Sequence, residues 1–219
     1  MKRSKMIYAV VLTGILVFIS CSCAIAVTTG ENGDVDDCFP NEPVYTPEMP
    51  EYHYNQGSSL YGQAQYGLAI ASFQKALEID ASFSSGYYGL AFTYRAQGRL
   101  DLALENYGEV IRLEPEYAQP YASRAELYLF VGRFNDAERD LDTYVKLYGQ
   151  YPAPYLARGD FFMDRRNYPR AVEDYTTAIE RNPNLQEAYL KYAGALLLSG
   201  RSEEAIIVFE QAIAISGAK

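Results

Sequence analysis

Small and large apolar residues recur along the chain at fixed positions of a 34-residue frame, which runs from residue 50 to residue 219. Position 20 of the frame is alanine in all five copies, and no insertion separates one copy from the next. Position 8 is always glycine or alanine, whereas positions 11 and 24 always carry a large apolar or aromatic side chain. A fixed period of this length predicts tandem structural repeats. The five copies span residues 50–83, 84–117, 118–151, 152–185 and 186–219.

The spacing of apolar residues inside the frame predicts two helices in each copy. In the second copy, Leu90 and Tyr94 share one helical face, and Ala103, Tyr107 and Val110 share the face of a second helix. The small residues at positions 8 and 20 let the two helices approach closely, and the large residues pack beside them. We expect helices near residues 52–63, 67–80, 86–97, 101–113, 120–131, 135–147, 154–165, 169–181, 188–199 and 203–215.

The end of the first helix in each copy is predicted at position 15, where glycine can adopt the positive φ of a helix stop. Three copies have glycine there, at Gly98, Gly132 and Gly200. The first copy has Ala64 instead and the fourth has Arg166. His53 stands at position 4, where the other copies have tyrosine, so we interpret it as a half-exposed packing residue and not as a catalytic base.

This pattern closely resembles the tetratricopeptide repeat family over residues 50–219. The resemblance implies an all-α fold, in which antiparallel helix pairs stack into a right-handed superhelix, an α-solenoid. It also implies a concave groove lined by the first helices, which would be aromatic toward the N-terminus, mixed with charge in the middle and aliphatic toward the C-terminus. The expected peptide-binding residues are Tyr54, Tyr61, Tyr88, Phe92, Arg95, Glu126, Leu129, Leu156, Asp160, Met163, Leu190 and Leu197.

Some members of that family bind the C-terminal carboxylate of a chaperone through lysine, asparagine and further basic residues of the groove. The matching positions of this chain hold other residues, so we do not expect a carboxylate clamp or work as a cytosolic co-chaperone. These residues are Tyr54, Ser58, Gly89, Gln119 and Ser123.

The N-terminal residues 1–26 have the composition of an export signal or a membrane anchor. Three bases precede the apolar run Met6–Ile19, and Ala24-Ile25-Ala26 fits a signal-peptidase site. Three interpretations stay open: cleavage before Val27, lipidation of Cys21 or Cys23, or retention of residues 6–27 as an anchor. Each places the remainder outside the cytoplasm, either secreted or tethered to the membrane only through this segment.

Residues 27–49 are predicted to be an acidic, proline-containing linker, because they hold no base and show no apolar period. Cys38 lies within this segment. After cleavage it would be the only thiol, which suggests an intermolecular disulfide or a free thiol, although an idle exposed cysteine is equally compatible.

The composition excludes several classes of function. The formal net charge of −9 disfavours nucleic acid as a partner, because an acidic surface repels phosphate. One histidine and three cysteines cannot build a usual multi-histidine or four-cysteine zinc site. No phosphate-binding loop or nucleophile motif occurs, so we expect no metal, no cofactor and no catalytic residues.

The chain is therefore interpreted as a non-enzymatic scaffold that binds a peptide segment of another exported protein. A structural subunit of an envelope or surface assembly, associating with itself, is the alternative, and an accessory subunit of an enzyme is a third class. We expect Ile206 and Ile213 to face outward at the last repeat, where no covering helix follows in the printed chain, and to dock a second copy or a partner.

One polar pair is predicted inside two of the repeats. Position 7 is arginine and position 23 is aspartate in the third and fourth copies, and in no other copy. Because the two changes occur together, we expect salt bridges that join the two helices of each repeat. The pairs are Arg124–Asp140 and Arg158–Asp174.

Overall fold

The computed structural model describes residues 8–12, 15–19 and 45–217, which fall into two units divided between Pro43 and Val44. The predictions that concern Cys21, Cys23, Cys38 and cleavage before Val27 lie outside the described residues. They stay predictions, as does most of the 27–49 linker.

The first unit contains a short antiparallel hairpin. Strand β1 (Tyr8–Leu12) pairs with β2 (Ile15–Ile19), in a register that places Tyr8 opposite Ile19 and Leu12 opposite Ile15. Both strands belong to the apolar run of the predicted export signal. Among the described residues, no helix has the length and apolar character needed to cross a membrane.

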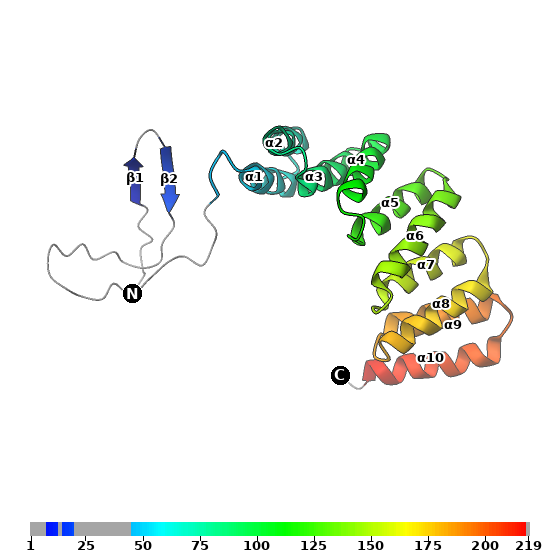
Figure 1. Ribbon diagram of the computed structural model, residues 1–219. Helices are drawn as coiled ribbons and strands as arrows, with labels where there is room; N and C mark the ends of the chain where they lie inside the picture. The colour runs from blue at the N-terminus through cyan, green and yellow to red at the C-terminus, as the bar shows by residue number, and fades with distance from the viewer. Residues whose placement is uncertain (1–7, 13–14, 20–44, 218–219) are drawn as a thin grey trace, which may run out of the picture. The chain divides into compact units, whose positions relative to one another are not determined.

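The second unit contains ten helices over residues 45–217, and each expected helix is present with both ends within two residues of the predicted position. Consecutive helices pack against each other, and α1 also contacts α3, so the helix pairs form the predicted α-solenoid (Figure 1). The helices are α1 (Pro50–Gly62), α2 (Tyr66–Ile79), α3 (Ser84–Ala96), α4 (Leu100–Leu113), α5 (Gln119–Phe130), α6 (Phe134–Tyr148), α7 (Ala153–Asp164), α8 (Tyr168–Arg181), α9 (Gln186–Leu198) and α10 (Ser202–Gly217).

The small positions of the frame are buried in every repeat. All five position-20 alanines are fully buried, and all five position-8 residues are buried as well. The large residues at position 24 fill the space beside them in the first four repeats, where each is at most 3% exposed. The core therefore continues from one repeat to the next, as the frame predicts.

His53 takes the structural place of the tyrosines at position 4. Its Nε2 lies 3.1 Å from the carbonyl oxygen of Pro47, six residues earlier. Tyr87 and Tyr121 donate their hydroxyl hydrogens to the carbonyls of Ala81 and Pro115 at the same offset. The half-buried imidazole thus packs and bonds like its tyrosine counterparts, which agrees with its interpretation as a packing residue.

Position 15 adopts positive φ in every repeat, whichever residue stands there. The φ angles are 74°, 78° and 81° at Gly98, Gly132 and Gly200, and 58° and 57° at Ala64 and Arg166. In each repeat this residue and the next donate their N–H groups to carbonyls of the last helical turn, which is the Schellman arrangement. Ala64 and Arg166 therefore pay a steric cost that glycine avoids.

We expect Arg166→Gly and Ala64→Gly to raise the free energy of unfolding by about 1 kcal/mol each. The left-handed conformation costs a residue with a Cβ about 1–2 kcal/mol, and glycine removes this strain. Part of the gain is offset because glycine also increases the conformational entropy of the unfolded chain. Urea denaturation monitored by circular dichroism measures the change. Gly98→Ala is the matched control and should lower stability by a similar amount. A lower midpoint for Arg166→Gly would contradict the expectation.

The structure confirms both predicted salt bridges. Nε and Nη2 of Arg124 donate to the Asp140 carboxylate over 2.7 and 2.8 Å, and Arg158 contacts Asp174 in the same way over 3.0 and 2.8 Å. Both aspartates are about one-twentieth exposed, at 5% and 4%. Nη1 of Arg158 also donates to Asp142 over 2.7 Å, so this arginine joins α6, α7 and α8.

The first repeat has a neutral counterpart of these ion pairs. Ser72 donates its hydroxyl hydrogen to Oε1 of Gln56 over 3.2 Å, at the same frame positions and the same 16-residue offset. Positions 7 and 23 are therefore joined by a polar contact in the first, third and fourth repeats, and this contact is an ion pair in the third and fourth.

Candidate functional site

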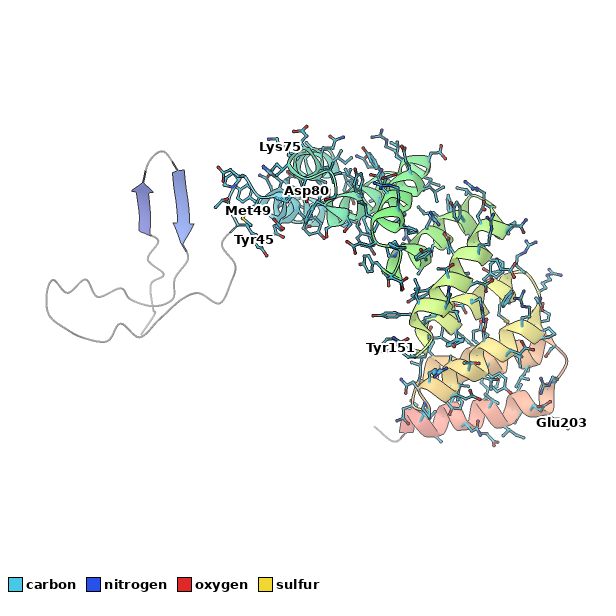
Figure 2. The ribbon with its side chains drawn as sticks, in the orientation of Figure 1. Tyr45, Met49, Lys75, Asp80, Tyr151 and Glu203 are labelled. Atoms are coloured by element: carbon cyan, nitrogen blue, oxygen red, sulfur yellow. The ribbon has the colours of Figure 1, made fainter. Side chains whose placement is uncertain are left out.

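The twelve residues predicted to bind a peptide all lie on the first helices of the repeats, and we call the surface that they form the first-helix face. None of the twelve is fully buried, so each presents part of its side chain to solvent. Figure 2 shows the side chains of these helices along the curved row, with Tyr151 labelled in the connection between α6 and α7. By helix, the residues are Tyr54 and Tyr61 on α1, Tyr88, Phe92 and Arg95 on α3, Glu126 and Leu129 on α5, Leu156, Asp160 and Met163 on α7, and Leu190 and Leu197 on α9.

The N-terminal part of the face is a connected group of aromatic rings. Phe92 on α3 lies 5.2 Å from Tyr88 and 6.5 Å from Tyr61 of α1, measured between ring centroids. Tyr54 packs in the same way on Phe73, with a centroid distance of 5.6 Å. Contacts of this kind fix the ring orientations, so the aromatic surface is formed before any ligand binds.

Two charged residues of the middle part bind each other. Nη2 of Arg95 on α3 lies 2.8 Å from Oε2 of Glu126 on α5. Their side chains are 39% and 61% exposed. An ion pair this exposed adds little to stability, so both groups can exchange their partner for a ligand at small cost.

Asp160 is held more firmly than its neighbours. It accepts a hydrogen bond from the Tyr175 hydroxyl over 2.7 Å, and the Lys191 ammonium donates to both of its oxygens over 2.8 Å. Burial raises the pKa of Tyr175, and the adjacent Asp160 carboxylate raises it further. Asp160 therefore joins the fourth repeat to the fifth, and its charge is already balanced by Lys191.

Tyr107 stands at the same frame position as Tyr175 but lacks a partner of this kind. Its hydroxyl oxygen is buried and forms no hydrogen bond within the described part of the chain. The residue at the place of Asp160 is Phe92, whose ring lies 6.3 Å from that of Tyr107 and cannot accept the hydrogen. Burial raises the pKa of Tyr107, so its hydroxyl stays protonated.

The aliphatic part of the face lies toward the C-terminus. Leu129, Leu156 and Met163 are half-buried against the core cluster that contains Phe161 and Phe162. Leu190 and Leu197 are more accessible, at 46% and 50% exposed. Of the five aliphatic residues predicted to bind a peptide, the two on α9 are therefore the most accessible.

The face also contains a pocket that the sequence pattern did not predict as such. It has a volume of about 330 Å³ and lies where α1, α3 and the connection from α4 to α5 meet. Tyr54 and Tyr88 are the predicted members. The others belong to connections and helix starts, where no periodic position marks them. All lining residues are Tyr54, Ser84, Ser85, Tyr88, Glu114 and Tyr117.

The last helix has an exposed apolar stripe, as expected for Ile206 and Ile213. These two side chains are 57% and 70% exposed, and Phe209 between them is 36% exposed, against at most 3% for its counterparts in the first four repeats. Val208 instead turns inward and packs near Leu196. No group of three or more potential metal ligands occurs among the residues that the structure describes.

Similar folds occur among solved structures. The structure of a MamA protein superposes with a TM-score of 0.69 at 20% sequence identity, covering 78% of this chain and 94% of that one. A MamA fragment from Desulfovibrio magneticus RS-1 gives 0.68 at 11% identity, with 78% and 96% covered. YrrB, described as a TPR protein with an unusual peptide-binding site, gives 0.62 at 19% identity, with 77% and 87% covered. At these identities the likeness shows the fold.

No curated protein sequence matches the chain. Family models do match it, however, and they match the segment that folds into helix pairs. Models described as tetratricopeptide repeat cover residues 50–83, 72–105 and 156–218, and a model described as TPR repeat covers residues 93–132. Because both the 34-residue frame and the paired helices occupy these same residues, the chain belongs to the tetratricopeptide repeat family.

Proposed function

We propose that the chain is an exported protein-interaction scaffold that holds a peptide segment of a partner protein on its first-helix face. The observation that carries the proposal is a difference in burial between two sets of residues in each repeat. Frame positions 8 and 20 are buried throughout, whereas all twelve residues of the first-helix face keep accessible surface. Tetratricopeptide repeat families generally bind proteins and not substrates, and the YrrB structure is described as having a peptide-binding site.

The chemistry of the face favours a segment with apolar or aromatic side chains. Aromatic rings are accessible on α1 and α3, and leucine side chains on α7 and α9. The charges between them are balanced internally by the Arg95–Glu126 and Lys191–Asp160 pairs. An extended peptide can therefore contact apolar surface at both ends without leaving a buried charge unpaired in the middle.

Loss of partner binding in a variant of this face tests the proposal. The full-length protein in membrane extract captures its partner, which mass spectrometry identifies, and the binding of the purified partner segment is then titrated. We expect Leu197→Asp to weaken that binding at least tenfold, because a carboxylate cannot be desolvated against an apolar side chain at low cost. Leu68→Asp on α2 is the matched control, since Leu68 is 58% exposed and Leu197 is 50% exposed.

Equal effects of the two substitutions would contradict a role of the first-helix face. A partner that binds both variants as tightly as the unchanged protein would show that the complex forms through another surface.

The extracytoplasmic location is part of the same proposal and rests on the N-terminal sequence. A reporter that is active only in the cytoplasm, fused after Lys219, should stay silent. Mass spectrometry of the mature N-terminus distinguishes a start at Val27 from lipidated Cys21 or Cys23 and from an intact Met1. Reporter activity would contradict export.

The exposed stripe on α10 favours a second candidate function, self-association into a structural assembly. In an antiparallel pairing centred near Phe209, Ile206 of one copy lies opposite Ile213 of the other, so the stripe is complementary to itself. Such a contact needs no opposite charges and covers two side chains that are more than half exposed. Measurement of the solution mass by light scattering before and after joint replacement of both isoleucines by glutamate tests this candidate. A mass that stays that of a monomer throughout would exclude it.

A further inference from the structure

Three of the six residues that line the pocket between α1 and α3 are tyrosines. Tyr54 comes from α1, Tyr88 from α3, and Tyr117 from the connection between α4 and α5. The rings of Tyr88 and Tyr117 lie 5.8 Å apart between centroids and are tilted by 42°. Three tyrosines from three separate segments thus line one open pocket, which at about 330 Å³ is large enough for the end of a long side chain.

The charge in this pocket is negative. Glu114 is the only charged residue among the six that line it, and no lysine or arginine contributes to the walls. Ser84, at the start of α3, donates a hydrogen bond to Oε1 of Glu114 and so holds the carboxylate at the pocket. Oε2 of Glu114 accepts no hydrogen bond from the described residues and is free to accept one from a ligand.

Tyrosine rings carry negative potential on their faces, and Tyr54, Tyr88 and Tyr117 all line this space. The pKa values of Tyr88 and Tyr117 are raised, chiefly by burial, so both phenols stay neutral and keep their hydroxyl hydrogens over the physiological range. A cation over such rings is attracted by their quadrupoles, most strongly where water is excluded. The rings and the carboxylate therefore favour the same kind of ligand.

We propose that this pocket binds the cationic end of a lysine or arginine side chain in the partner's segment. This assignment rests on the proposed function, because it specifies that the bound partner segment carries a positive charge at one point of the first-helix face. Ser84, Ser85 and Glu114 offer oxygen acceptors, which suit the N–H donors of an ammonium or guanidinium group. A quaternary ammonium group has no N–H to donate and would leave these acceptors unused.

The pocket is continuous with the aromatic row of the first-helix face. Tyr88 forms one of its walls and also contacts Phe92, which in turn contacts Tyr61. A peptide lying along this row therefore reaches the pocket with a neighbouring side chain. The partner segment should consequently hold an apolar or aromatic stretch followed or preceded by a base.

The test is an NMR titration of the full-length protein with two short probes that differ only in charge. The probes are the acetylated, amidated pentapeptide Gly-Gly-Lys-Gly-Gly and the same peptide with norleucine in place of lysine, and the arginine peptide is a third arm. We expect the lysine or the arginine peptide to bind roughly tenfold more tightly than the norleucine peptide at low salt. Equal binding of all three peptides would overturn the proposal.

Two substitutions, each with a matched control, locate the binding. Glu114→Gln removes the charge but keeps an oxygen acceptor for Ser84. It should weaken the binding of the cationic peptide severalfold, whereas Glu116→Gln in the same connection should leave that binding unchanged. Tyr117→Leu should also weaken the binding of this peptide, whereas Tyr151→Leu, at the same frame position one repeat later, should leave it unchanged. Tyr117 and Tyr151 are 41% and 48% exposed, so neither change removes core packing. Full binding by Glu114→Gln and Tyr117→Leu would overturn the assignment.

A further arm separates this inference from its alternatives. Tighter binding of phosphocholine than of either cationic peptide would overturn the assignment to a protein side chain. If the partner segment is sensitive to Leu197→Asp but not to Glu114→Gln, the pocket assignment fails while the proposed function stands. If the cationic peptide binds the pocket but the partner segment is insensitive to Leu197→Asp, the proposed function fails instead.

Discussion

Replacing Arg158 by alanine should lower the free energy of unfolding by about 3–5 kcal/mol, because it leaves the Asp174 carboxylate buried without its cation. Asp174 is only 4% exposed and receives two hydrogen bonds from the guanidinium group. The Arg158 pKa is raised, first by its hydrogen bond to Asp174, so the arginine carries its charge under all ordinary conditions. Urea denaturation at neutral pH measures the loss.

The arrangement around Arg158 makes the opposite substitution less costly. Asp174→Ala leaves Arg158 beside Asp142, which still accepts a hydrogen bond from Nη1 over 2.7 Å, so the charge keeps a partner. We therefore expect a smaller loss for Asp174→Ala than for Arg158→Ala, and a smaller loss again for the joint replacement by methionine and leucine, which leaves no buried charge. The exposed Arg112→Ala is the control and should change stability by less than about 0.5 kcal/mol.

The third repeat provides an independent check of this reasoning. Arg124 binds Asp140 with the same geometry but has no counterpart of Asp142 among the described residues. The two single substitutions in that repeat should therefore cost similar amounts. Equal losses in the fourth repeat, or losses below about 1 kcal/mol in both, would contradict the account based on a buried charge.

The helices could be predicted from the sequence because one burial pattern is repeated five times. A residue such as Ala103 at position 20 is fully buried in the packed core, and the same restriction on size applies in every repeat. The Arg158–Asp174 pair was predictable for a related reason. Arginine at position 7 and aspartate at position 23 occur together in the same two repeats and in no other, and mutual contact makes both charges tolerable in a helix interface.

The contacts between repeats were harder to predict. Asp160 was predicted only as a residue of the peptide groove, and the structure shows that it also bonds to Tyr175 in its own repeat and to Lys191 in the next. The bond to Tyr175 could have been predicted from aspartate at position 9 together with tyrosine at position 24 of the same repeat. The second repeat lacks this combination, because it has Phe92 at position 9 with Tyr107 at position 24. Glu114 and Tyr117 lie in the connection after α4, where no helical period applies, so their place beside Tyr88 depends on the path of that connection.

Gly89→Ala should lower the free energy of unfolding by about 1–3 kcal/mol, although alanine is the better helix former, because the added methyl group overlaps a buried ring. A Cβ at this position would lie 2.6 Å from Cε1 and 2.7 Å from Cζ of Phe73. The same edge of the ring also lies 2.7 Å from a Cβ built on Gly57. Phe73 is 2% exposed and packs on Tyr54, so the ring cannot withdraw without disturbing the core.

Gly194→Ala is the matched control, because Gly194 also lies inside a first helix but a Cβ there meets no atom within 4 Å. It should raise stability by about 0.5–1 kcal/mol through helix propensity alone. Phe73→Leu in the Gly89→Ala background should cost less than the sum of the two single changes, since the smaller side chain makes room for the methyl group. If Gly89→Ala stabilises the protein as much as Gly194→Ala does, then the ring moves freely, and the contact between Phe73 and the two glycines does not limit how closely α1, α2 and α3 pack.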